Sequence, residues 1–143
     1  MDTNSIMMML QDKLPKDPAS VMALREKLDK MSETKKDEFI QILPTLKLKS
    51  PALVFWVGAF LFGGLGVARF MIGDKQEGIM RLCLLLVIPI IFGALAAITG
   101  VVAIAIIGSV SYTIAIVWAF VDLFLIFKAT RRKNLDKILQ AIG

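Results

Sequence analysis

Apolar residues are distributed unevenly along the chain, and the boundary falls near Ser50. Residues 1–49 contain nine Lys or Arg and eight Asp or Glu, a charge density that no bilayer interior accepts. Residues 51–72 then form a mostly apolar run, and residues 82–127 form a second run in which Asp122 is the only charged residue. Because a helix needs about 20 mostly apolar residues to cross a bilayer, this pattern predicts an all-α integral membrane protein.

The polar first part of the chain predicts three short helices. Asp17 followed by Pro18 is typical of a helix start, and Ser32 is suited to cap a third helix that ends at Pro44. Six of the eight methionines lie in the first 31 residues, where they form either a small, imperfect core or an adaptable binding surface. So short a segment makes a weak independent domain, so we expect it to dock on a partner, on a second copy or on the membrane surface.

The second apolar run is too long for one crossing. As a single helix its 46 residues would reach about 69 Å. Two arrangements stay open: a half-inserted hairpin followed by one span, or two full spans that turn near Thr99 and Gly100. With residues 51–72 as the first span, we expect two full transmembrane helices with an additional re-entrant or third membrane helix.

Charges at both ends of the apolar region bear on the topology. Positively charged flanks favour the cytoplasm, so both ends are expected inside, which favours two crossings, whereas the length of the second run favours three. The chain opens with Asp2 and a short run of methionines rather than a basic segment, so the head is expected to stay on the side of synthesis. The residues expected at the interface, in contact with anionic lipid headgroups, are Lys47, Lys49, Trp118, Lys128, Arg131, Arg132 and Lys133.

These features predict three parts of a multi-pass protein of the inner or plasma membrane. Residues 1–46 form a cytosolic helical head, residues 47–130 a transmembrane domain, and residues 131–143 a basic cytosolic tail.

Two charges inside the apolar region, Arg69 and Asp122, are the first candidates for a functional site, because ionisable groups are expensive in a membrane. With two crossings they would lie near opposite faces and could not meet. With three crossings they would lie near the same face and could pair.

Small residues spaced along the apolar runs predict close helix packing, within the chain or between copies. The residues on these faces are Ala59, Gly63, Gly64, Ala68, Ala96, Gly100, Ser111, Ala115 and Ala119.

The composition argues against several classes of function. The chain has no histidine, which removes the commonest general base and metal ligand, and its lone Cys83 lies in an apolar run. Asp74 and Glu77 form a solvated turn rather than a catalytic pair. The net charge of +5 comes mainly from the basic tail and indicates lipid rather than nucleic acid. We therefore expect no enzyme activity, no cofactor and no metal.

Several short elements occur together in the order of a known family. They are Gly63-Gly64-Leu65-Gly66, Arg69-Phe70, Gly73, Gly78-Ile79, Trp118 and Asp122-Leu123. Over residues 47–130 the chain thus resembles the TM-two (two-transmembrane) domain family. It has Ala68 where eukaryotic members usually carry an acid, and an unusually long segment between the Gly-Ile and Trp-Asp elements. The resemblance implies a membrane module without established enzymatic chemistry, often fused to other domains.

The leading hypothesis is a non-enzymatic anchor, assembly or regulatory subunit, which associates with copies of itself or with another membrane protein and recruits a partner through its head. The alternative is an oligomeric ion channel or small transporter that uses Arg69 and Asp122.

Overall fold

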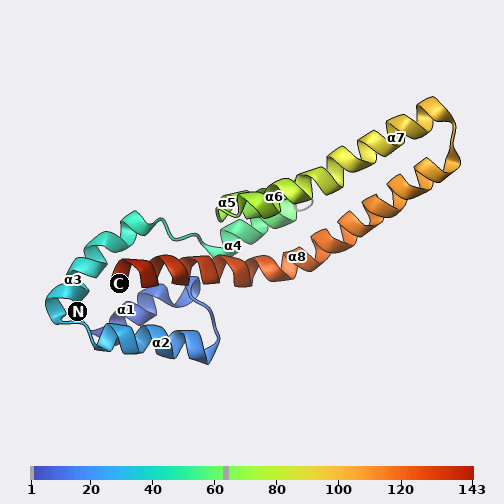
Figure 1. Cartoon of the computed structure of the whole chain (residues 1–143). Coiled ribbons are helices and arrows are strands. Elements are labelled where there is room, and N and C mark those ends of the chain that lie inside the picture. Colours follow the sequence, from blue (N-terminus) through green and yellow to red (C-terminus); the bar gives the residue numbers. More distant parts are fainter. Residues whose placement is uncertain (1, 63–64) are drawn as a thin grey trace. The chain divides into compact units, whose positions relative to one another are not determined.

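The structure, a computed structural model, describes residues 2–62 and 65–143, and over these residues it is helical without strands (Figure 1). Gly63 and Gly64, predicted to pack helices, lie outside the described residues. The polar part of the sequence forms the helices α1 (Thr3–Leu10), η1 (Gln11–Lys13), α2 (Pro18–Asp29), α3 (Glu33–Ile42) and η2 (Leu43–Leu46). Those of the apolar part are α4 (Pro51–Leu53), η3 (Val54–Leu61), α5 (Val67–Met71), α6 (Lys75–Leu82), η5 (Cys83–Val87), α7 (Ile88–Thr99) and α8 (Val102–Ile142).

The chain forms two compact units. The head unit comprises Met1–Pro51 together with Lys128–Gly143, and the apolar unit comprises Ala52–Phe127. The long helix α8 therefore contributes to both units. The sequence had divided the chain into a head, a transmembrane domain and a separate basic tail.

Capping explains where α2 and α3 start. The Asp17 carboxylate accepts a hydrogen bond from the Ser20 backbone N–H at 3.0 Å, and the Ser32 hydroxyl accepts one from the Lys35 N–H at 3.4 Å. Both residues act as predicted from the sequence. Hydrogen bonding from Ser20 also lowers the pKa of Asp17. The cap contribution is therefore complete above the ordinary pKa of 3.8 and is lost as the pH falls through the lowered value.

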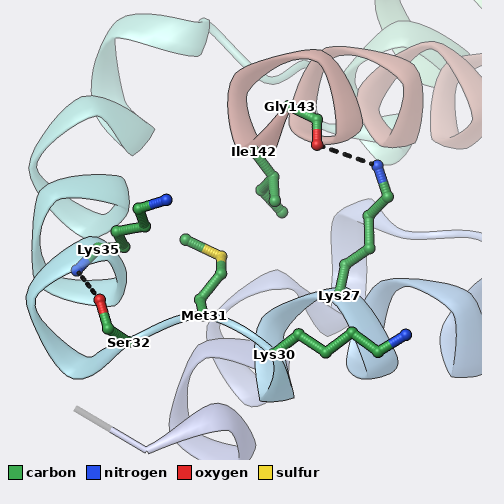
Figure 2. A pocket seen from close by; sticks show the side chains of 7 residues that line it. All are labelled: Lys27, Lys30, Met31, Ser32, Lys35, Ile142 and Gly143. Atoms are coloured by element: carbon green, nitrogen blue, oxygen red, sulfur yellow. Dashed lines mark hydrogen bonds between the residues drawn. The ribbon is translucent and has the colours of Figure 1, made fainter.

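The end of α8 completes the core of the head unit. Ile138 is fully buried among core side chains from the other helices, namely Ile6, Leu10, Leu14, Leu24, Leu28 and Phe39. Figure 2 shows the last residues of the chain close to the junction of α2 and α3, where Lys27 Nζ donates a hydrogen bond to the Gly143 backbone oxygen at 3.5 Å. Residues 131–143 are thus the end of a packed helix rather than a tail, because their apolar side chains recur on one face.

Residues 51–72, predicted as one span, fold back on themselves instead. η3 is a π-helix that ends at Leu61. The next helix, α5, starts only at Val67, after Gly66 with φ +73°. The two arms pack closely, since a Cβ on Gly58 would lie 2.7 Å from the Ala68 Cα. The prediction of one continuous helix was wrong because it rested on the apolar composition of residues 51–72, whereas Gly66 adopts a left-handed conformation that breaks the helix.

A second glycine turn connects this hairpin to α6. The Asp74 N–H donates to the Arg69 carbonyl at 2.8 Å and the Gly73 N–H to the Phe70 carbonyl at 3.1 Å, with Gly73 at φ +84°. These two bonds satisfy the last carbonyls of α5 in the pattern of a Schellman motif. The chain therefore reverses direction after α5, so that α6 can pack beside the hairpin.

Gly66 is expected to be essential to the hairpin. A Cβ there would lie 2.8 Å from the Gly78 carbonyl oxygen, and the left-handed backbone disfavours any side chain. We expect Gly66→Ala to lower the free energy of unfolding in detergent micelles by about 2 kcal/mol. Gly93→Ala is the matched control, because nothing lies within 4 Å of the added methyl group. Equal stability of the two variants would contradict this packing.

Among the described residues, two helices are long and apolar enough to cross a membrane. The first is the continuous helix Lys75–Thr99, formed by α6, η5 and α7, and the second is α8. The π-helical segment η5 ends two residues before Pro89. Its wider turn accommodates the proline, which has no backbone N–H to donate. Gly100, at φ +68°, ends α7 and separates it from α8. Of the two arrangements left open for residues 82–127, the structure has two helices that turn at Gly100.

Candidate functional site

The buried charges of the apolar unit meet in one ionic cluster, formed by Arg69, Arg81, Asp122 and Asp74. Both Asp122 oxygens accept hydrogen bonds from the Arg69 guanidinium, of which the Nε bond measures 3.3 Å. Arg81 Nη2 lies 2.9 Å from Asp122 Oδ1, and Arg69 Nη1 lies 3.4 Å from Asp74 Oδ2. The cluster is shielded from solvent, since the side chains of Arg81 and Asp122 are only 4% and 8% exposed.

Three elements bring these side chains together. Arg69 lies on α5 and follows the break at Gly66, while Asp122 lies on α8 among the buried residues of that helix. Arg81 follows Gly78 on the buried face of α6, and Gly78 has no side chain that would keep the hairpin away. The glycine contact between Gly66 and Gly78 is therefore what lets both arginines reach one carboxylate.

Two of these residues had been predicted as a site, and the structure pairs them. The sequence tied the meeting of Arg69 and Asp122 to three crossings, because it treated residues 51–72 as one span. The fold-back puts Arg69 beside Asp122 in a chain with two helices long enough to cross. Asp74 had been assigned to a solvated turn, but its side chain is only 29% exposed and faces Arg69.

Sequence reasoning did not identify Arg81. The signal was its spacing from Asp74 and Gly78, because positions i, i+4 and i+7 share one face of a helix. Within the described part of the chain, Arg81 Nε is buried without a hydrogen-bond partner. The cluster thus leaves one buried donor unsatisfied, and both arginines share the carboxylate of Asp122.

The predicted packing residues have different surroundings. Ala59, Ala68 and Ala115 are buried, and Ala96, Ser111 and Ala119 are half-buried. Gly100 is exposed in the turn after α7 rather than packed. The close contact between α7 and α8 comes instead from Gly108, where a Cβ would lie 2.9 Å from the Phe92 Cβ. The Ser111 hydroxyl donates to the Ile107 carbonyl of its own helix at 2.9 Å.

The predicted interface residues lie mostly on the surface. Lys47, Lys49, Lys128, Arg132 and Lys133 are exposed, Trp118 is 48% exposed, and Arg131 is half-buried. Within the range that the structure describes, no group of His, Cys, Asp or Glu could hold a metal ion.

A second buried polar group, Asn134 of α8, lies in the head unit. Its side-chain nitrogen donates to the carbonyls of Lys13 and Lys49, at 3.0 and 2.8 Å, and its side-chain oxygen accepts from the Lys49 N–H at 3.0 Å. One amide therefore holds the segment after α1 and the segment before Pro51 to the end of α8. A lone Asn in a basic sequence carried no signal for this role.

Replacing this amide is expected to loosen the head unit. Asn134→Leu keeps a similar volume but leaves three backbone groups without their partner, so we expect a loss of about 1–3 kcal/mol in the free energy of unfolding. Thermal unfolding in detergent measures the loss. Gln140→Leu, at an exposed position of the same helix, is the control and should change stability little. Equal effects of both substitutions would contradict a role for the amide.

Several hollows lie on the described surface of the head unit, and two of them are lined by methionine together with other apolar residues. In the first (Figure 2), Met31 and Ile142 line the interior and Lys27, Lys30 and Lys35 lie at the rim. Lys30 is paired with Glu26 at 2.6 Å, so this rim is an ordinary solvated surface. The second is an open groove of about 750 Å³ between the α1–η1 segment and α2, which we call the methionine groove. Its lining residues are Asn4, Met7, Met8, Gln11, Asp12, Leu14, Pro15, Lys16, Val21 and Arg25.

Comparison of the chain with protein-family models, with curated proteins and with solved structures finds no match.

Proposed function

We propose that the chain is a non-enzymatic membrane anchor whose head unit recruits a cytosolic partner protein. The observation that carries this proposal is the methionine groove on the surface of the head unit. The core of this unit is completed by Ile138 of α8, so the groove remains free for a partner. Met7 and Met8 line this groove, and Met8 is 75% exposed. Flexible thioether side chains at a surface suit an apolar helix face of a partner.

The topology we propose has two crossings, by Lys75–Thr99 and by the first part of α8. The head unit contains residues from both ends of the described chain, which supports the same, cytoplasmic side for both. Residues 82–121 contain no charged residue, so the far side would receive only the short turn at Gly100. Residues 51–72 would then form a re-entrant hairpin on the head side.

The resemblance to the TM-two family also remains part of the proposal. The residues that carry it come from distant parts of the sequence and contact one another: Arg69 binds Asp122, and the Phe70 ring lies against Gly78. Such contacts give a physical reason for these elements to occur together. The alternative of an oligomeric channel or small transporter that uses Arg69 and Asp122 is less favoured, because these two side chains pair with each other.

The partner is tested by photo-crosslinking in intact cells. A photoreactive residue at Met8 or at Gln11, two exposed residues that line the groove, is expected to give the same adduct of defined mass. Val21→Glu, which puts a charge into the groove, should abolish it. The control position is Gln140, exposed on α8, which should not give that adduct. The proposal fails if the groove positions give no adduct, or the same adducts as Gln140.

A further inference from the structure

The two ends of the apolar unit differ in the number of helical segments that they contain. At the end that connects to the head unit, η3, α5, α6 and α8 come together (Figure 1). Phe55 of η3 stacks on Phe127 of α8 with ring centroids 4.7 Å apart, and Gly66 lies against Gly78. The ionic cluster joins the same elements. Four helical segments therefore share this level.

Of the residues that the structure describes, the far end contains only α7 and the first part of α8. The contact between Gly108 and Phe92 joins these two helices, and beyond it Ile98 and Val102 are 82% and 72% exposed. The unit thus narrows from four helical segments to two.

The hairpin of η3 and α5 is apolar on its outer surface and short. Trp56, Phe60 and Leu61 are 56%, 61% and 67% exposed, which calls for a surrounding of lipid chains. From Pro51 to Leu61 the arm reaches at most about 16 Å, roughly half of the 30 Å hydrocarbon core. Inserted as proposed above, the hairpin would widen the protein in the leaflet on the head side only.

From this asymmetry we propose that the apolar unit is a wedge that prefers membranes whose head-side leaflet is convex. A protein that takes up more area in one leaflet fits best where that leaflet is the larger one, and binding by shallowly inserted apolar helices depends on curvature for the same reason. The exposed apolar surface of the hairpin is thus covered by the acyl chains of a curved bilayer. This inference rests on the proposed membrane insertion and adds a function to it.

The experiment reconstitutes the full chain into phosphatidylcholine vesicles containing some phosphatidylglycerol, small sonicated ones and large extruded ones. Insertion is measured by flotation after carbonate washing, and orientation by impermeant thiol labelling of Lys27→Cys in a Cys83→Ala background. The wedge predicts a ratio of outward to inward heads that is severalfold higher in small vesicles, where the outer leaflet is convex.

Two variants separate the wedge from the bulk of the head. The triple substitution Trp56→Gln, Phe60→Gln and Leu61→Gln leaves the head and both long helices intact, and it should remove the dependence on vesicle size. Ile98→Ala with Val102→Ala narrows the far end and should retain it. Insertion with the same orientation ratio in both vesicles, or a ratio unchanged by the triple substitution, would overturn the wedge alone. Failure to resist carbonate would overturn membrane insertion as well.

Discussion

Replacing Asp122 by Asn is expected to destabilise the apolar unit by about 3–5 kcal/mol, the cost of leaving buried charges without their partner. The substitution keeps the shape of the side chain but removes the negative charge that holds Arg69 and Arg81. Asp74 cannot replace it, because it reaches only Arg69, at 3.4 Å, and is partly exposed. The two guanidinium groups would then repel each other in an apolar setting.

The free energy of unfolding in detergent micelles measures this effect. Asp136→Asn is the matched control, since Asp136 is an exposed acid on the same helix, and it should change stability little. Arg69→Gln combined with Asp122→Asn should cost less than the sum of the two single substitutions, by about 1–3 kcal/mol, because the residues are in contact. Additive effects, or a loss no larger than that of Asp136→Asn, would contradict the ionic cluster.

Truncating Ile138 to Ala is expected to destabilise the head unit by about 2–5 kcal/mol, the usual cost of a cavity in a packed core. Ile138 is fully buried, although it belongs to α8 and is far in sequence from the rest of that core. A small domain has little stability to lose. Hydrogen exchange should therefore show the amides of α1, α2 and α3 losing protection together with the end of α8.

The control for this truncation is Met22→Ala, which removes apolar volume from a side chain that is 69% exposed. It should leave the protection of the head amides close to that of the unsubstituted protein. If Ile138→Ala behaved in the same way, α8 would not complete the core.

Local features of the fold could be predicted from the sequence because their causes are local. Asp17 and Ser32 cap helices through hydrogen bonds to residues three positions away. The composition of residues 82–127 predicts helices that are long and apolar enough to cross a bilayer, and the described residues form such helices. The turn near Gly100 followed from length and from glycine in the same way.

The features that the sequence did not predict depend on contacts between distant residues. Gly66 was noted only as part of the Gly63-Gly64-Leu65-Gly66 element, and its role in breaking the helix depends on its backbone conformation and its contact with Gly78. Arg81 and Asn134 acquire their roles only from partners on other elements. Ile126, Thr130, Asn134 and Ile138 form a buried series at spacings of four, and this periodicity was the available sign that α8 continues past the apolar run.

The side of the membrane on which residue 75 lies tests the central claim most directly, since it decides whether residues 51–72 cross or fold back. Single cysteines at Lys27, Lys75, Thr99 and Gln140, in a Cys83→Ala background, are labelled with an impermeant thiol reagent in oriented membranes. We predict that Lys27, Lys75 and Gln140 are labelled from the same side, and that Thr99 is labelled only from the other. Labelling of Lys75 from the side opposite to Lys27 would show that residues 51–72 cross the membrane and would contradict the re-entrant hairpin.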